Sequence, residues 1–246
     1  MTRRALVRAR ALVIVCAITA SVPVGAQRGR GGGAAPPASA RSAAPIDITG
    51  YWVSPITEDW KYRMVTPKKG VFDALPLNPE GRKVGESWDP ARDEAAGEQC
   101  RAYGAPAIMR IPGRVHITWQ DDQTMKVETD AGTQTRVLRF GAAAAAGEPS
   151  WQGHSVAQWN IAGRSLKVVT TNLRPGYIRK NGAPYSAKTV LTEYWDLNTL
   201  PNGDRFLTIT TRVEDPVYFT RPLQTSSDFK KLADAAGWNP TPCASR

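Results

Sequence analysis

The stretch RVHITWQDDQTMKVETDAGTQTRVLRF, residues 114–140, alternates apolar and polar side chains in three short runs separated by turn-forming residues. In the first two runs the apolar residues are Val115 and Ile117, then Met125 and Val127. An apolar side chain at every second residue is typical of a β-strand with one buried face. The short turns between the runs therefore predict a three-stranded antiparallel meander.

Further strands are expected on both sides of this meander. Four downstream segments are rich in Val, Ile, Thr and aromatic residues and are bounded by Gly, Pro or Asn, at 155–161, 165–173, 188–196 and 205–213. With a first strand around Trp52, the count reaches about eight. The sequence is thus mainly β in class and predicts an antiparallel up-and-down barrel of about eight strands. A β-sandwich produces the same alternation and stays open as the competing fold.

Two segments have helical character instead. Residues 90–103 hold helix-forming side chains between Pro90 and Gly104, and residues 226–236 begin at Ser226 and end before a glycine. Proline is favoured at the first helical position, serine at the N-cap and glycine just after the last turn. We expect one helix near 90–103 and a C-terminal helix near 226–236.

The formal net charge of +10 is unevenly distributed. Residues 1–45 contain seven arginines, no lysine and no acidic residue, which leaves 25 basic and 22 acidic residues, a net charge of +3, in residues 46–246. The basic character therefore belongs mostly to the N-terminal segment. This composition does not support a nucleic-acid partner.

The N-terminal segment has the organisation of an export signal. In residues 1–26, arginines precede a ten-residue apolar run that is too short to span a bilayer, and Val24-Gly25-Ala26 offers the small side chains that a signal peptidase needs. Cys16 lacks the small preceding residues that lipidation requires. Residues 27–45 predict a disordered Gly/Ala/Pro-rich tether. Residues 46–246 predict one β-barrel domain, periplasmic or secreted, with no transmembrane segment after signal removal.

Removal of the signal peptide leaves two cysteines, Cys100 and Cys243. In an oxidising compartment an even pair predicts a disulfide bond. This bond would tie the first half of the chain to its C-terminus. Two unpaired thiols are the alternative.

Gly50-Tyr51-Trp52, in the stretch DITGYWVSP at 47–55, resembles the G-x-W signature of the lipocalins and their calycin relatives. The resemblance implies that Gly50 bends the chain into the barrel floor and that Trp52 closes the floor against a late-strand cation, with Arg212 as the candidate. Thr192-Glu193-Tyr194 is similar to the T-D-Y motif of that family, with glutamate in place of aspartate. The chain as a whole also resembles secreted bacterial proteins, which implies no activity.

The segment NLRPGYIRKNGAPYS, residues 172–186, combines cations and aromatic rings between Pro-Gly and Asn-Gly turns. These groups suit an anionic or aromatic ligand at a barrel mouth, through charge-assisted hydrogen bonds and cation–π contacts. A solvated connection between two strands is the alternative. The stretch Trp60-Lys-Tyr-Arg63 forms a second cluster of this kind. The predicted ligand-binding residues are Arg174, Tyr177, Arg179, Lys180 and Tyr185.

Glu193 is the best single candidate for a catalytic acid, because it shares a strand face with Trp195 and would be partly buried there. Adjacent acids such as Glu214 and Asp215 point to opposite faces of a strand and form no catalytic pair.

The sequence predicts neither a metal site nor a cofactor. His116 and His154 are its only two histidines, and the cysteines lack metal-ligand spacing. The segment after the tether also contains no nucleophile elbow, phosphate-binding loop or dinucleotide fingerprint.

Three functional hypotheses follow. The favoured one is a secreted, lipocalin-like barrel that binds a small apolar or aromatic molecule, with an anionic group as a further option. The alternatives are a pocket enzyme, a hydrolase or isomerase using Glu193 with a tyrosine or arginine partner, and an envelope interaction protein without a pocket. An interior filled with side chains would argue against both hypotheses that place a ligand inside the barrel.

Overall fold

The computed structural model describes residues 38–141 and 145–245 of the chain. Helices cluster between the first two strands, and the remainder of the described chain is mostly strand. In chain order the elements are β1 Gly50–Val53, α1 Trp60–Arg63, α2 Pro79–Glu86, α3 Pro90–Ala95, the 3-10 helix η1 Gln99–Tyr103, α4 Ala105–Ile108, β2 Arg114–Trp119, β3 Thr124–Thr129, β4 Gln134–Phe140, β5 His154–Asn160, β6 Ser165–Thr171, β7 Gly176–Arg179, β8 Ala183–Tyr185, β9 Val190–Thr199, β10 Arg205–Glu214 and β11 Leu223–Lys231.

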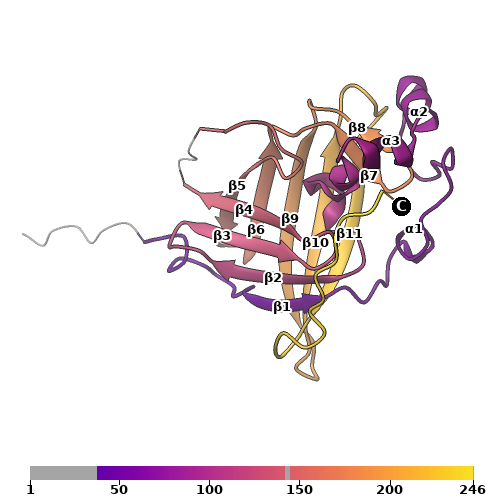
Figure 1. Cartoon of the computed structure of the whole chain (residues 1–246). Helices are drawn as coiled ribbons and strands as arrows, with labels where there is room; N and C mark the ends of the chain where they lie inside the picture. The colour runs from indigo at the N-terminus through magenta and orange to yellow at the C-terminus, as the bar shows by residue number, and fades with distance from the viewer. Residues whose placement is uncertain (1–37, 142–144, 246) are drawn as a thin grey trace, which may run out of the picture. The chain divides into compact units, whose positions relative to one another are not determined.

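Nine strands close into a barrel in the order β1-β11-β10-β9-β6-β5-β4-β3-β2, and β1 pairs with β2 to complete the ring (Figure 1). The predicted β class and barrel are therefore confirmed, and the sandwich does not form. The barrel differs from the predicted eight antiparallel strands in two ways. It has nine strands, and β4 and β5 run parallel, with Leu138 beside Ser155. Parallel neighbours need a crossover connection. The connection between β4 and β5, of which residues 142–144 lie outside the described residues, is therefore not a hairpin.

The predicted C-terminal helix near 226–236 is wrong, because the ninth strand of the barrel occupies the start of this segment. Residues Leu223–Lys231 form β11, which pairs with β10 along its length and with β1 at its end. Ser227 and Phe229 of this strand are buried on the inner face. Local helix propensity is weak compared with the ladder hydrogen bonds and burial gained by closing the barrel, so the tertiary context decides this segment.

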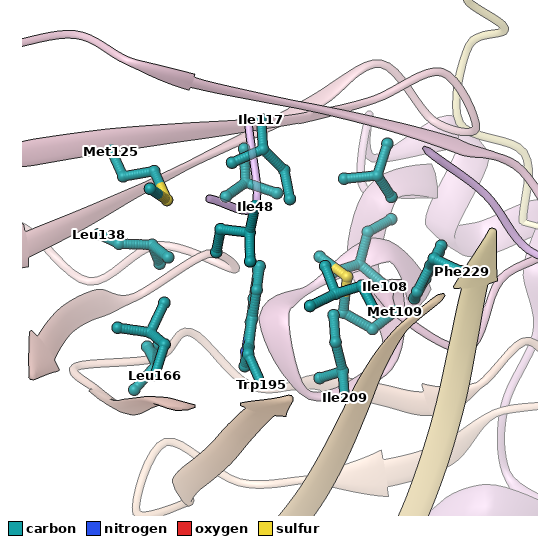
Figure 2. Packing of buried hydrophobic residues seen from close by; sticks show 14 of the residues in the cluster. Ile48, Ile108, Met109, Ile117, Met125, Leu138, Leu166, Trp195, Ile209 and Phe229 are labelled. Carbon is teal, nitrogen blue, oxygen red and sulfur yellow. The ribbon is translucent and has the colours of Figure 1, made fainter. Parts of the chain in front are cut away.

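Apolar side chains from all nine strands fill the barrel interior. Figure 2 shows Trp195 reaching towards Ile48, with Leu138 and Leu166 beside them. Each fully buried side chain of this size contributes about 1.5–3 kcal/mol to folding. Consequently the interior is a packed core, and a ligand site has to be sought at the ends of the barrel.

One end of the barrel is covered by the helices and by the β7–β8 hairpin, which gather on the same side of the barrel in Figure 1. β7 packs against η1 and α4, and β8 packs against α2. Asn78 and Asp89 cap α2 and α3 by accepting backbone hydrogen bonds, each followed by proline at the first helical position. The predicted helix at 90–103 is present as two pieces, because the chain breaks at Gly97 with φ +70°.

The opposite end is closed by the chain that precedes β1. Ile46 and Ile48 enter the core, and Trp159 Nε1 donates a hydrogen bond of 2.7 Å to the carbonyl oxygen of Ala40. The predicted tether at 27–45 therefore ends earlier than expected: residues 38–45 belong to the folded unit, while residues 27–37 and the predicted signal peptide at 1–26 lie outside the described residues.

Gly50 begins β1, and Trp52 on the same strand contacts a cation other than the predicted Arg212. Gly50 has φ +98°, and a Cβ atom there would come too close to Lys231 Nζ unless that side chain moved. The Lys231 ammonium lies 4.6 Å from the centre of the Trp52 ring. The expected partner, Arg212, forms an exposed ion pair with Glu214 instead. Trp52 is fully buried, so this cation–π contact helps close the sheet.

The predicted disulfide bond between Cys100 and Cys243 is present, across 143 residues. It ties η1 to the C-terminal tail. Thr241 of the same tail forms an isolated bridge with Ala131, at the turn between β3 and β4. The bond therefore anchors the helical cap and the tail to one end of the barrel.

Candidate functional site

The five predicted ligand-binding residues lie in three separate places on the helical cap. Arg174 pairs with Glu98 at 2.8 Å and stacks over the Trp151 ring, at 4.4 Å. Arg174 is exposed and is not part of the lining of either cavity that contains the other four residues.

Tyr177 and Tyr185 lie in a second place, a cleft of about 200 Å³ that also contains Asp93 and Arg101. Asp93 neutralises Arg101 at 3.1 Å, and Arg101 stacks over the Tyr177 ring at 4.7 Å. Burial raises the pKa of both tyrosines, so both stay protonated at neutral pH. Because Tyr177 and Tyr185 are buried among cap residues, they are better explained as packing residues than as ligand contacts.

Arg179 and Lys180 lie in the third place, where the two clusters expected from the sequence meet. The Trp60–Arg63 stretch forms α1, and its Tyr62 and Arg63 line one pocket together with Arg179, Lys180 and Arg110. We call this the cationic pocket: its lining contains four cations and no carboxylate. The other lining residues are Thr66, Ala102, Ala107, Ile111, Pro112 and Ile178.

Arg63 is the most buried cation of this pocket, with a side chain that is 1% exposed. Its Nε donates a hydrogen bond of 2.9 Å to the carbonyl of Arg110, one Nη donates to Ser54, and the other pairs with Glu58. Burial, followed by the positive charge of Arg110, lowers the pKa of Arg63 to about 10. The guanidinium therefore remains charged at neutral pH in an environment that disfavours its charge.

Arg110 and Arg179 complete the arginine cluster. Arg110 pairs with Asp59 at 2.8 Å through Nη2, while its buried Nη1 has no hydrogen-bond partner within the described part of the chain. Both Nη atoms of Arg179 donate to the backbone carbonyl of Asp73 at 3.3 Å, and its guanidinium lies 4.5 Å from the centre of the Tyr62 ring. Burial and then the charge of Arg110 lower the pKa of Arg179 to about 10.

The cationic pocket is small and opens beside a larger recess. Its volume is about 60 Å³, several times what one water molecule requires. A recess of about 350 Å³ shares Thr66 and Lys180 with it and is also lined by Pro67, Lys68, Lys69 and Trp88. Together the two cavities reach the lower end of the volumes typical of small-molecule sites.

A third cleft, of about 830 Å³, lies at the opposite end of the barrel, beside the chain that precedes β1. It is lined by Arg41, Arg164 and Arg205, but Arg41 and Arg164 are exposed, and Arg205 donates a hydrogen bond of 2.7 Å to the carbonyl of Asp47. No polar atom of this lining is both buried and unpartnered among the described residues. This cleft therefore lacks a buried, unpartnered donor such as Arg110 in the cationic pocket, or Arg101 and Tyr185 in the cleft with Tyr177.

Glu193 lies inside the barrel, where it is fully buried and not partly buried as predicted. Both of its carboxylate oxygens accept from Arg136, at 3.0 and 2.6 Å, and Arg136 also approaches Thr170 at 3.4 Å. Glu193 is not part of the lining of the cationic pocket or of the barrel-end cleft. A carboxylate held by two such bonds in a packed core stabilises a buried arginine, and it has no visible access to a substrate.

The two histidines do not converge. His116 stacks on the Tyr51 ring, 3.9 Å between centres, and lies 3.4 Å from Glu128, whereas His154 begins β5. Across residues 38–141 and 145–245, no group of three metal-ligating side chains comes together. Within the same residues, the helices are all too short or too polar to cross a lipid bilayer.

Sequence reasoning missed Arg110 and Arg136. Arg136 was detectable, because it is in phase with Leu138 and Phe140 on a strand whose inner face is apolar. Arg110 carried no such signal: it lies in an irregular connection after α4, and only the packing of α1 and β7 around it reveals its role.

A search of protein-family models, of curated proteins and of solved structures finds no match to this chain. The function has to be argued from the site alone.

Proposed function

We propose that this protein is an exported β-barrel protein that binds a small molecule through an anionic group held in the cationic pocket. The observation that carries the proposal is the cluster of the buried Arg63 with the partly buried Arg110 and Arg179, in which Arg110 retains an unpartnered donor among the described residues. Glu58 and Asp59 pair with Arg63 and Arg110, and gathering three guanidinium groups with little access to water remains costly. An anion in the pocket would offset that cost through charge-assisted hydrogen bonds.

The shape of the site supports a ligand with two parts. The cationic pocket accommodates a carboxylate, sulfate or phosphate group, and guanidinium groups match the geometry of these anions. The adjoining recess offers the Trp88 side chain and the alkyl stems of Lys68 and Lys69 to an apolar or aromatic body. This site replaces the barrel interior as the place where the ligand is expected.

Export is supported by the disulfide bond between Cys100 and Cys243, which persists in an oxidising compartment. The signal-like pattern at residues 1–26 points the same way.

Calorimetric titration and thermal unfolding with two probes, inorganic phosphate and phenyl phosphate, test the proposal. A ligand at ten times its Kd should stabilise the protein by about 1.4 kcal/mol, which raises the Tm of a domain this size by roughly 3 to 6 °C. We expect phenyl phosphate to bind more tightly than inorganic phosphate, because its ring can enter the recess.

Arg179→Gln and Arg110→Gln should each weaken binding about tenfold or more, since each removes a charged hydrogen-bond donor. Arg164→Gln is the matched control: it removes the same charge from the barrel-end cleft and should leave the affinity unchanged. Equal affinities for all variants, or no binding of either probe, would overturn the proposal.

A further inference from the structure

We propose that the anion in the cationic pocket is the phosphate of an anionic phospholipid, and that the segment around α1 docks the protein on the membrane surface that contains it. This inference rests on the proposed function and names its ligand class.

The first observation is where exposed hydrophobic side chains gather. Seven large hydrophobic side chains are strongly exposed in the described part of the chain, and four of them fall within residues 60–71. Trp60 and Met64 are each 65% exposed and Val65 is 70% exposed, while Val71 is 38% exposed. Such clustering marks an interaction surface more strongly than single exposed side chains do.

The second observation is that the same segment forms a wall of the pocket. Tyr62, Arg63 and Thr66 line the cationic pocket, and they alternate along the chain with the exposed Trp60, Met64 and Val65. One short helix and the residues that follow it therefore carry both the exposed apolar side chains and a wall of the proposed anion site.

The third observation is the positive charge of the same segment. The segment 60–72 carries Lys61, Arg63, Lys68 and Lys69 and no acidic residue. Its three lysines are exposed. Cations near an anionic bilayer attract the protein to the surface, and tryptophan favours the boundary between headgroups and acyl chains. Apolar side chains flanked by lysines suit an anionic lipid surface in particular.

The dimensions agree with a lipid bound by its headgroup. A pocket of about 60 Å³ admits a phosphate but not a whole lipid, so the acyl chains would remain in the bilayer. Met64 and Val65 would enter the same apolar layer while Arg179 and Arg110 contact the phosphate.

The test is co-sedimentation of the full exported chain, with its disulfide intact, on vesicles of phosphatidylcholine mixed with phosphatidylglycerol, compared with pure phosphatidylcholine vesicles. We expect strong binding to the mixed vesicles and at least tenfold weaker binding to the neutral ones. The triple variant Trp60→Ser, Met64→Ser, Val65→Ser should reduce vesicle binding at least tenfold while its affinity for phenyl phosphate in solution stays unchanged.

Two further variants separate the contributions. Arg179→Gln should reduce binding to vesicles about fivefold or more and should also weaken phenyl phosphate binding. The control Ile161→Ser, Leu200→Ser removes exposed apolar side chains elsewhere, 59% and 44% exposed, and should change neither measurement.

The outcomes distinguish the two proposals. Phenyl phosphate binding without vesicle binding, or vesicle binding that the triple variant or Arg179→Gln leaves intact, would overturn the membrane inference and leave the proposed function standing. A dimer in solution that the triple variant dissociates would assign the patch to a second copy of the chain and also overturn the inference. Failure to bind either phosphate probe would remove both proposals.

Discussion

Glu193 and Arg136 form a fully buried ion pair inside the barrel, with exposed side-chain fractions of 0% and 1%. The carboxylate and the guanidinium are both shielded from water, and the charge of each is compensated mainly by that of the other. Hydrogen bonding continues from Arg136 to Thr170, whose hydroxyl lies 2.8 Å from that of Ser155. Glu193, the candidate catalytic acid, is therefore better explained as the counter-ion that stabilises the buried Arg136.

Glu193→Gln should therefore destabilise the fold by about 3 to 5 kcal/mol in urea unfolding, because it leaves the Arg136 charge buried without a counter-ion. The double variant Glu193→Leu, Arg136→Met should recover most of this loss, since it removes both charges at similar volume. Glu214→Gln, in an exposed pair with Arg212, is the control and should change the midpoint little. Wild-type stability of Glu193→Gln would contradict this account.

The residue scale also explains Gly50. Its positive φ favours glycine, and a Cβ atom there would also require the flexible end of the Lys231 side chain to move. Trp52, two residues further on, packs against a cation of β11, Lys231, and not against the predicted Arg212.

At the scale of elements, Asp215 joins the cap to the barrel. This buried carboxylate, in the connection after β10, accepts hydrogen bonds from the backbone of Ser186, the Thr189 hydroxyl at 2.7 Å and the backbone N–H groups of Val217 and Tyr218. Asp215 therefore holds in place the connection between β9 and the β7–β8 hairpin, which carries Arg179.

Burial alone would raise the pKa of Asp215, but these hydrogen bonds outweigh it and lower the pKa below 3.8. Because the pKa is lower in the folded state, the stabilisation is fully present above the unfolded value and is lost as the pH falls through the folded value. Asp215→Asn should reduce stability at pH 7 by about 1 to 3 kcal/mol. The gap between wild type and variant should narrow below about pH 4. A gap independent of pH, in unfolding measured from pH 7 to pH 2, would refute the assignment.

At the scale of the whole molecule, the disulfide bond closes a long loop that contains most of the barrel. In the chain-entropy description such a loop gives up to about 5 kcal/mol, and typical gains are about 2 to 4 kcal/mol. Cys100→Ser, Cys243→Ser should lower the Tm of oxidised protein by roughly 5 to 15 °C. Reductant should have the same effect on the wild type and none on the variant. An unchanged Tm would show that the bond contributes no stability.

Much of the barrel could be predicted from local pattern. Val115, Ile117, Met125 and Val127 are buried as the two-residue period required, because a strand places alternate side chains on opposite faces whatever its partners are. β11 could not be predicted in this way, since its polar sequence has helical character and only pairing with β10 and β1 makes it a strand.

Part of the candidate site could be predicted from the sequence. The sequence drew attention to Arg179, Lys180 and the Trp60–Arg63 stretch, because cations beside aromatic rings are visible without a structure. It also favoured Tyr177 and Tyr185, which the fold buries in a different cleft. Residue chemistry is local, but which residues face one cavity depends on packing between segments far apart in the chain.

By itself, the sequence determined the mainly β class, the meander at 114–140 and the cysteine pair, because each depends on neighbouring residues or on composition; the export signal at residues 1–26 stays a prediction. Only the tertiary structure decided the nine-stranded closure, the parallel β4–β5 pair, the burial of Glu193 against Arg136 and the meeting of α1 with β7 around Arg110. These features depend on contacts between distant segments, whose free energies outweigh local preference and leave no local mark in the sequence.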